Sequence, residues 1–301
     1  MRLAIAASPE VAIPTIEAIL QSDHTLIRII SQPDRPAGRG KLLTPTPVSQ
    51  WAIDSHTELV RPSDLAQLAS AVEDVDCVLT IGYGVLITPD VLSIPRYGFL
   101  NLHFSLLPRW RGAAPVQRSI EAGDLVTGVT VFQLDEGMDT GPIYSVARFA
   151  LDSDITSDEL LTELGELGIE PVLDALSMAE RGIRPTPQSS DGVTRARKLS
   201  KAEGEIDWRA SANEISAKIR AFTSNPGAWT SFRGTQLKIA APIVSEMTLS
   251  PGEIAIIEKK VHIGTGTTAL EIGTITAPGK TSMSAYAWAN GARIAAGERC
   301  E

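Results

Sequence analysis

The segment that most constrains this chain is Asn101-Leu102-His103-Phe104-Ser105-Leu106-Leu107-Pro108-Arg109-Trp110-Arg111-Gly112-Ala113. It follows a short apolar run, and Pro108 with Gly112 predicts a tight loop at its end. In an extended chain, side chains at positions i and i+2 lie on the same face. The amide of Asn101 and the imidazole of His103 are therefore expected to converge at the end of a strand.

An amide and an imidazole in this arrangement have the chemistry that acyl transfer needs. The amide can donate a hydrogen bond to a developing oxyanion, and the imidazole can move a proton near neutral pH. A neighbouring Asn and His also often form an ordinary structural hydrogen bond. The pair alone therefore leaves both interpretations open.

A carboxylate further along the chain favours the catalytic interpretation. Asp139 lies between Gly137 and Gly141, and these glycines predict a loop bent at two points that presents the carboxylate to a neighbour. An Asp beside Gly also commonly caps a turn, which is the alternative role. Among the four histidines of the chain, only His103 has an Asn two residues before it in the sequence.

The N-terminal half alternates short apolar runs with amphipathic segments. Strands are expected at 3–6, 26–30, 77–81 and 98–103, and helices at 11–20, 64–72 and 156–179. This alternation predicts an α/β fold with a Rossmann-like parallel sheet flanked by helices. Ligands of such sheets bind beyond the carboxyl ends of the strands, where Asn101 and His103 fall. The glycine patterns of dinucleotide-binding and Walker A loops are missing, which argues against a Rossmann dehydrogenase or a P-loop enzyme.

The C-terminal third predicts a separate, small β domain. Residues 184–192 are rich in Pro, Ser and Gly, a composition typical of a linker. A helix at 212–222 and short strands at 229–232, 237–240, 252–257, 260–263 and 270–275 then predict an OB-like β-barrel. We therefore expect a catalytic domain at 1–183, a linker at 184–204 and an OB-like domain at 205–301.

The net charge of −9 is unevenly distributed. Residues 191–301 hold 14 Lys/Arg against 11 Asp/Glu, whereas residues 1–190 hold 13 against 25, so the C-terminal part is better suited to a polyanion. No apolar run reaches the roughly 20 residues of a membrane span. The two cysteines, Cys77 and Cys300, form no disulfide or metal-binding pattern. We expect a cytoplasmic protein without membrane contact.

Residues 105–115 resemble the signature of the methionyl-tRNA formyltransferase family, which is folate-dependent. The resemblance extends over essentially the whole chain. Further matching segments are Gln32–Lys41, which resembles an inserted loop of the family, and Asp139–Gly141, Lys198–Lys201, Ile206–Trp208, Arg220–Phe222, Pro278–Lys280 and Asn290–Arg293. Two segments depart from the pattern: Ala7-Ser8-Pro9 stands where the family often has Gly-Thr-Pro, and 223–229 is less rich in Trp.

The resemblance implies transfer of a formyl group from 10-formyltetrahydrofolate to the α-amine of methionyl initiator tRNA, without a metal. Asn101, His103 and Asp139 would form the catalytic trio. Ser105, Leu106, Leu107 and Pro108 would contact the folate, and Arg35, Arg39 and Lys41 in the inserted loop would approach the tRNA. Asn101 would then donate to the oxyanion and His103 would carry the proton. Asp139 would hold His103 in one tautomer and stabilise its charged form, and the protein would act as a monomer.

Two other functions remain open from the sequence. Folate-dependent formyltransferases and hydrolases that act on small molecules share the Asn-x-His…Asp arrangement. A non-catalytic RNA-binding protein could keep the same sheet, but binding alone would not need all three residues of the trio. The basic segment 35–41 and the barrel-like C-terminal part favour tRNA over a small molecule.

Overall fold

A computed structural model describes residues 1–37 and 42–301 of the chain, so Arg39 and Lys41 of the expected inserted loop lie outside the described residues. The chain divides into two compact units. Unit 1 comprises Met1–Pro115, Val126–Ala150 and Leu161–Ala196, and unit 2 comprises Val116–Leu125, Leu151–Leu160 and Arg197–Glu301. In the part of the chain that the structure describes, no helix is long and apolar enough to cross a membrane.

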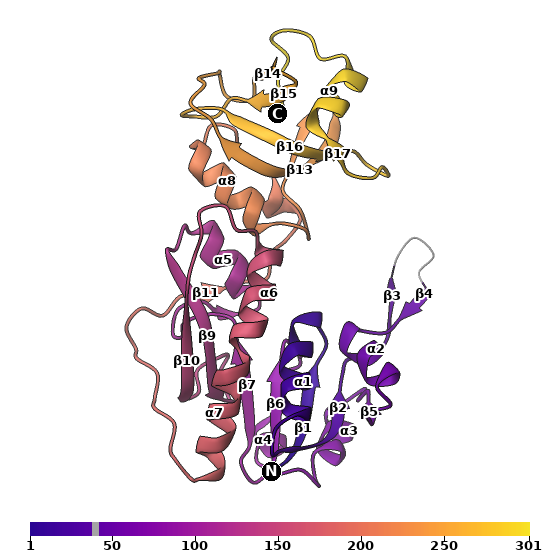
Figure 1. Ribbon diagram of the computed structural model, residues 1–301, viewed down its shortest axis with the longest axis vertical. Coiled ribbons are helices and arrows are strands. Elements are labelled where there is room, and N and C mark those ends of the chain that lie inside the picture. Colours follow the sequence, from indigo (N-terminus) through magenta and orange to yellow (C-terminus); the bar gives the residue numbers. More distant parts are fainter. Residues whose placement is uncertain (38–41) are drawn as a thin grey trace. The chain divides into compact units, whose positions relative to one another are not determined.

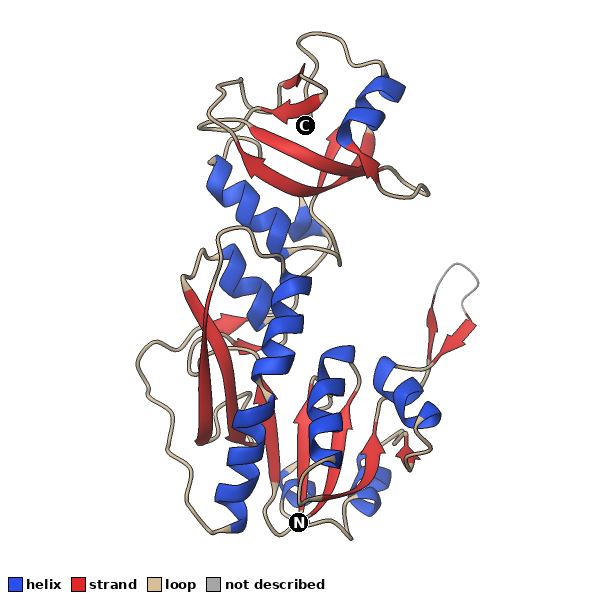
Figure 2. Cartoon of the chain, in the orientation of Figure 1, coloured by secondary structure: helices blue, strands red, loops and turns tan. Residues whose placement is uncertain are grey.

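Unit 1, within its described residues, is built on a seven-stranded sheet with the strand order β10-β9-β7-β6-β1-β2-β5 (Figures 1 and 2). The strands are β1 (Arg2–Ala7), β2 (Thr25–Ile30), β5 (Leu59–Val60), β6 (Cys77–Ile81), β7 (Phe99–His103), β9 (Val126–Gln133) and β10 (Ile143–Ala150). Five neighbouring strands of the sheet are parallel, in the order β7, β6, β1, β2 and β5. Strands β9 and β10 continue the sheet beyond β7 in antiparallel fashion. The predicted α/β class with its parallel sheet is confirmed, and the antiparallel extension was not predicted.

Helices cover both faces of this sheet. Helices α1 (Ile13–Leu20) and α7 (Ile169–Glu180) pack together on one face. On the other face, residues of α3 (Leu65–Ala71) and α4 (Pro89–Leu92) form one apolar cluster with Ala4 and Ala6 of β1. Because both faces are covered, β1 and β6 consist almost entirely of buried apolar residues, which is why the sequence shows them as continuous apolar runs.

One predicted helix is wrong in its extent. The sequence predicts a single helix over 156–179, whereas the structure has α6 (Ser157–Leu167) and α7, which meet at Gly168. A Cβ atom at Gly168 would collide with the side chain of Leu102 in β7. Glycine therefore allows the joint between the two helices to lie close against the sheet.

The remaining elements of unit 1 are short. They are the 3-10 helix η1 (Glu10–Ala12), the antiparallel pair β3 (Arg35–Ala37) and β4 (Leu42–Thr44), helix α2 (Pro47–Asp54), and the parallel pair β8 (Arg111–Gly112) and β11 (Arg195–Ala196). Strand β11 lies in the segment 184–204, which the sequence assigned to a linker. Residues up to Ala196 belong to unit 1. Although the segment is irregular and rich in Pro and Ser, its backbone forms hydrogen bonds with Ile143 and with β8 of the same unit.

Unit 2 contains a curled antiparallel sheet of order β12-β13-β16-β15-β14, with β17 paired to β16 (Figure 2). Its helices are α5 (Pro115–Glu121, whose first residue belongs to unit 1), the 3-10 helix η2 (Ala202–Gly204), α8 (Ala212–Ala221) and α9 (Ala285–Ala292). Its strands are β12 (Trp229–Phe232), β13 (Thr235–Val244), β14 (Ile254–Ile257), β15 (Lys260–Ile263), β16 (Leu270–Thr276) and β17 (Met283–Ser284). A capping box of Ser211 and Glu214 begins α8, which packs on β13. The predicted run of short antiparallel strands is confirmed.

Candidate active site

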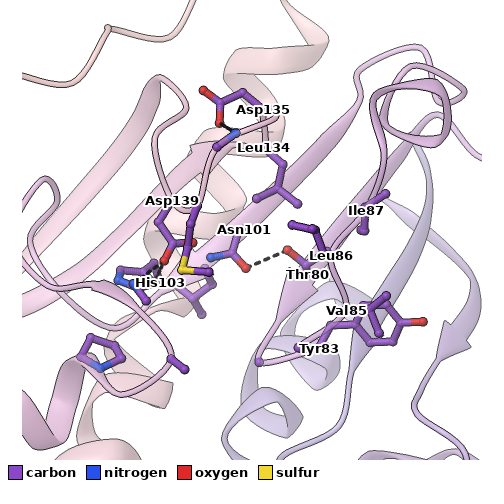
Figure 3. Close-up of a pocket in the computed structure, with 18 of the residues that line it drawn as sticks. Thr80, Tyr83, Val85, Leu86, Ile87, Asn101, His103, Leu134, Asp135 and Asp139 are labelled. Carbon is purple, nitrogen blue, oxygen red and sulfur yellow. Dashed lines mark hydrogen bonds and ion pairs between the residues drawn. The ribbon is translucent and has the colours of Figure 1, made fainter. Parts of the chain in front are cut away.

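A cavity of about 470 Å³ opens at the carboxyl ends of β6 and β7 (Figure 3). Its apolar lining includes Tyr83, Val85, Leu86, Ile87, Leu92 and Leu134, and its polar lining includes Thr80, Asn101, His103, Asp135 and Asp139. Its volume falls within the range of small-molecule sites, about 300–1,000 Å³. The strand ends that the sequence indicated thus border a cavity, and all three residues of the predicted trio line it.

Asn101 is oriented by a residue that the sequence did not single out. Thr80 of β6 and Asn101 of β7 are partners in the parallel strand register. The buried Thr80 hydroxyl donates a hydrogen bond of 2.7 Å to Oδ1 of Asn101. The oxygen of the amide is thereby turned toward β6, and the donating nitrogen end faces His103 and Asp139 (Figure 3).

His103 is held in one tautomer by a backbone carbonyl. Its Nε2 atom lies 2.9 Å from the carbonyl oxygen of Trp110. Because a carbonyl can only accept a hydrogen bond, Nε2 carries the proton, and Nδ1 is the unprotonated nitrogen of the neutral ring. The Nδ1 atom lies 3.8 Å from Oδ2 of Asp139, which is too long for a hydrogen bond. The expectation that Asp139 sets the tautomer is therefore wrong, and the Trp110 carbonyl has that role.

Burial and charge act on His103 in opposite directions. The side chain is almost inaccessible to water, and this burial lowers the pKa of His103 below its ordinary value of 6.5. The charge of Asp139 and the hydrogen bond to the Trp110 carbonyl both raise this pKa, but they do not outweigh burial. His103 is therefore neutral at neutral pH, and its Nδ1 atom can accept a proton.

Asp139 is presented by a tightly folded loop. Its backbone is left-handed, with a φ of 53°, a conformation that Asp tolerates better than most residues. Its Oδ2 atom accepts a hydrogen bond of 2.7 Å from the backbone N–H of Gly112. A Cβ atom at Gly141 would collide with the carbonyl oxygen of Gln133, so this glycine is required by close approach rather than by its own φ.

The residues predicted to contact folate do not line the cavity. Ser105 is fully buried, and its hydroxyl donates a hydrogen bond of 2.7 Å to the carbonyl oxygen of Arg109. The N–H of Leu107 donates to Oγ1 of Thr130 at 3.1 Å. Neither these two residues nor Leu106 and Pro108 are among the described residues that line the cavity. In the structure this run fixes the loop that carries Trp110.

The predicted tRNA contacts are described only in part. Arg35 lies in β3, and its guanidinium donates a hydrogen bond of 2.5 Å to Oε1 of Gln32. Gln32 in turn donates to the carbonyl oxygen of Tyr83, in the apolar wall of the cavity. Among the residues that the structure describes, no group of three or more His, Cys, Asp or Glu side chains is arranged to hold a metal ion.

Comparison with known protein families identifies the chain as a formyl transferase. Residues 1–176 match the family described as formyl transferase, and residues 198–293 match its C-terminal domain. The chain is 40% identical over 306 residues to the methionyl-tRNA formyltransferase of Thermobifida fusca, covering 99% of each chain. It belongs to the methionyl-tRNA formyltransferase family and is an enzyme of formyl transfer.

Solved structures of low sequence identity share the fold. HypX from Aquifex aeolicus, in complex with tetrahydrofolic acid, matches with a TM-score of 0.67 and 19% identity over 96% of this chain, which spans 47% of that protein. A methionyl-tRNA formyltransferase from Clostridium thermocellum matches with a TM-score of 0.59 and 15% identity, over 90% of this chain and 98% of that one. At these low sequence identities, the two matches show that the fold is shared.

Replacing Asp139 by Asn tests how its charge acts on His103. We expect kcat to fall by about 10²-fold, the lower end of contributions from acid–base catalysis. The carboxylate raises the pKa of His103, so its loss lowers that pKa further, and the acid limb of the kcat/KM profile moves to lower pH. Binding of tRNA, measured by filter retention, is expected to persist. An acid limb at the wild-type position would contradict this role.

Replacing Thr80 by Val tests the orientation of Asn101. The change removes the hydroxyl donor but keeps the side-chain shape, and a hydrogen bond of this kind is worth about 0.5–1.5 kcal/mol, so we expect kcat to fall roughly 2- to 10-fold. KM for the formyl donor is expected to stay the same. Thr80→Ser, which keeps the hydroxyl, is the matched control. Equal kcat values for the two variants would show that the hydrogen bond does not orient the amide.

Proposed function

We propose that this protein transfers the formyl group of 10-formyltetrahydrofolate to the α-amino group of methionine carried by initiator tRNA. The observation that carries the proposal is the convergence of an amide donor, a neutral imidazole and a carboxylate on one cavity. Membership of the methionyl-tRNA formyltransferase family supports this choice of substrates. We further propose that the enzyme acts as a monomer in the cytoplasm.

The trio accounts for each step of the transfer. The amine nitrogen attacks the formyl carbon and forms a tetrahedral oxyanion, which the Asn101 amide stabilises; one such donor is worth about 2.7–4 kcal/mol. His103 accepts the proton that the attacking nitrogen loses, through its unprotonated Nδ1. The bond between the formyl carbon and N10 of the folate then breaks, and His103 returns the proton to N10. Asp139 stabilises the imidazolium between the two proton transfers.

The apolar wall of the cavity suits the flat ring system of a folate. The buried Tyr83 and Ile87 and the partly buried Leu92 offer apolar surface in the cavity, and the trio lines its polar part. We propose that the folate ring lies against this apolar wall and that its N10 then faces the polar residues of the trio. The complex of HypX with tetrahydrofolic acid supports the ability of this architecture to hold a folate. Ser105, Leu106, Leu107 and Pro108 would then support the site from outside the cavity.

Recognition of tRNA is assigned to two basic regions. Arg35, Arg39 and Lys41 in the inserted loop would contact phosphates and base edges near the acceptor end. Residues 191–301, with their net positive charge, would contact the phosphate backbone elsewhere. The net charge of −9 for the whole chain means that binding depends on where these basic groups cluster.

A formylation assay tests the proposed reaction directly. Purified protein with 10-formyltetrahydrofolate and methionyl initiator tRNA is expected to give N-formylmethionyl-tRNA, separated from the substrate on an acid gel. The His103→Ala variant, which lacks the proton carrier, is expected to lose about 10²–10⁴-fold in rate. If no formylated tRNA forms while a formylated small amine or free formate accumulates, the small-molecule alternative replaces the proposal.

Replacing Arg39 by Ala tests the assignment of the inserted loop. We expect KM for initiator tRNA to rise and the preference for initiator over elongator tRNA to weaken, while KM for the formyl donor stays the same. Arg181→Ala, which removes an exposed arginine at the end of α7, is the matched control for loss of one positive charge. Equal effects of the two substitutions on tRNA would contradict a specific role of Arg39.

A further inference from the structure

The segment from Thr186 to Ala196 is hydrogen-bonded to the loop that follows His103 and to the loop that carries Asp139, although the sequence predicts a linker there. At one end, Thr186 and Ile143 exchange backbone hydrogen bonds of 2.7 and 2.8 Å. At the other end, β11 pairs with β8, and the N–H of Arg111 donates to the carbonyl oxygen of Thr194 at 3.0 Å. We call residues 186–196 the strap.

Gln188 of the strap makes four hydrogen bonds that join two loops. Its Nε2 atom donates to the carbonyl oxygens of Asp139 at 2.9 Å and of Gly141 at 2.8 Å. Its Oε1 atom accepts from Nη2 of Arg111 at 2.7 Å and from Nε of the same guanidinium at 3.1 Å. Both ends of the amide are therefore satisfied, and a flipped amide would set donor against donor and acceptor against acceptor.

The strap also contacts the peptide that fixes the tautomer of His103. Oγ1 of Thr194 accepts a hydrogen bond of 2.8 Å from the N–H of Trp110. The carbonyl of Trp110 is the acceptor for Nε2 of His103, and Trp110 has a left-handed backbone with a φ of 64°. The strap thus holds the residues on both sides of the imidazole, Trp110 through Thr194 and Asp139 through Gln188.

We propose that Gln188 is a positioning residue that fixes the distance between the Asp139 carboxylate and His103. The inference rests on the proposed function for its kinetic part. Only a side chain with two N–H donors and an acceptor can bridge two carbonyl oxygens and a guanidinium, and glutamine has these groups at the required reach. Without this bridge, the hydrogen bond from Gly112 still links the Asp139 carboxylate to the loop after His103, but the backbone of the Asp139 loop loses the two hydrogen bonds from Gln188.

Two substitutions test the hydrogen bonds that Gln188 makes to Arg111 and to the Asp139 loop. Gln188→Met keeps the length of the side chain and removes all four hydrogen bonds. Gln188→Glu keeps the acceptor for Arg111 and loses both donors to the Asp139 loop. We expect each variant to lower kcat by about 10- to 100-fold, because a displacement of about 1 Å in a catalytic group costs this much. KM for the formyl donor is expected to stay the same. Ser190→Ala, an exposed change in the same strap, is the matched control.

Two further readouts distinguish positioning from a general structural role. In the Asp139→Asn background, Gln188→Met is expected to cause little additional loss of kcat, because its effect passes through Asp139. By nitrogen-15 NMR without substrate, Gln188→Met is expected to lower the pKa of His103. The Asp139 carboxylate, which raises this pKa, is then no longer held near the imidazole. The NMR titration needs no turnover, so it tests the positioning role even if the proposed reaction fails.

Specific results would overturn the proposal. Wild-type kcat in Gln188→Met, full activity in Gln188→Glu, or additive losses with Asp139→Asn would each show that the amide does not position the carboxylate. An unchanged pKa of His103 in Gln188→Met would show the same without reference to catalysis. Equal losses in Gln188→Met and Ser190→Ala would assign the effect to the strap as a whole.

Discussion

The hydrogen bond between Nε2 of His103 and the carbonyl oxygen of Trp110 is the interaction on which the site depends. It fixes the proton on Nε2 and leaves Nδ1, on the side of Asp139, as the basic nitrogen. The two residues lie seven positions apart, so one strand end and the loop after it supply both the base and the group that sets its tautomer. The contacts of Thr194 and Gln188 matter because they hold this loop and its neighbour in place.

Burial and charge together give His103 its chemical character. Burial favours the neutral imidazole, which makes the residue an available base at neutral pH. The Asp139 carboxylate favours the imidazolium that forms once a proton has been accepted. Because Nδ1 carries no proton in the neutral ring and lies 3.8 Å from Oδ2 of Asp139, the carboxylate acts on neutral His103 through its charge and not as a hydrogen-bond partner. In the reaction that we propose, these two effects let His103 first accept the substrate proton and then release it.

The sequence predicted the parts of the site that depend on local periodicity. Asn101 and His103 share a face because strand side chains alternate, and Asp139 was found through its glycine-flanked loop. Thr80 could not be predicted, since its contact with Asn101 depends on which strands are neighbours and in which register. Gln188 was missed for another reason: the composition around it resembles a linker, and composition does not show which backbone carbonyls its side chain reaches. The parallel sheet was predictable because strands covered on both faces are continuously apolar.

The protonation state of His103 is the most direct test of the role assigned to the Trp110 carbonyl. Nitrogen-15 NMR of histidine-labelled protein, with the His103 signal assigned by its loss in a His103→Gln variant, distinguishes the two neutral tautomers from the charged ring. The hydrogen bond to the Trp110 carbonyl and the burial of the ring predict a neutral imidazole at neutral pH, protonated on Nε2 and unprotonated on Nδ1. A proton on Nδ1, or a charged imidazolium at neutral pH, would contradict this prediction.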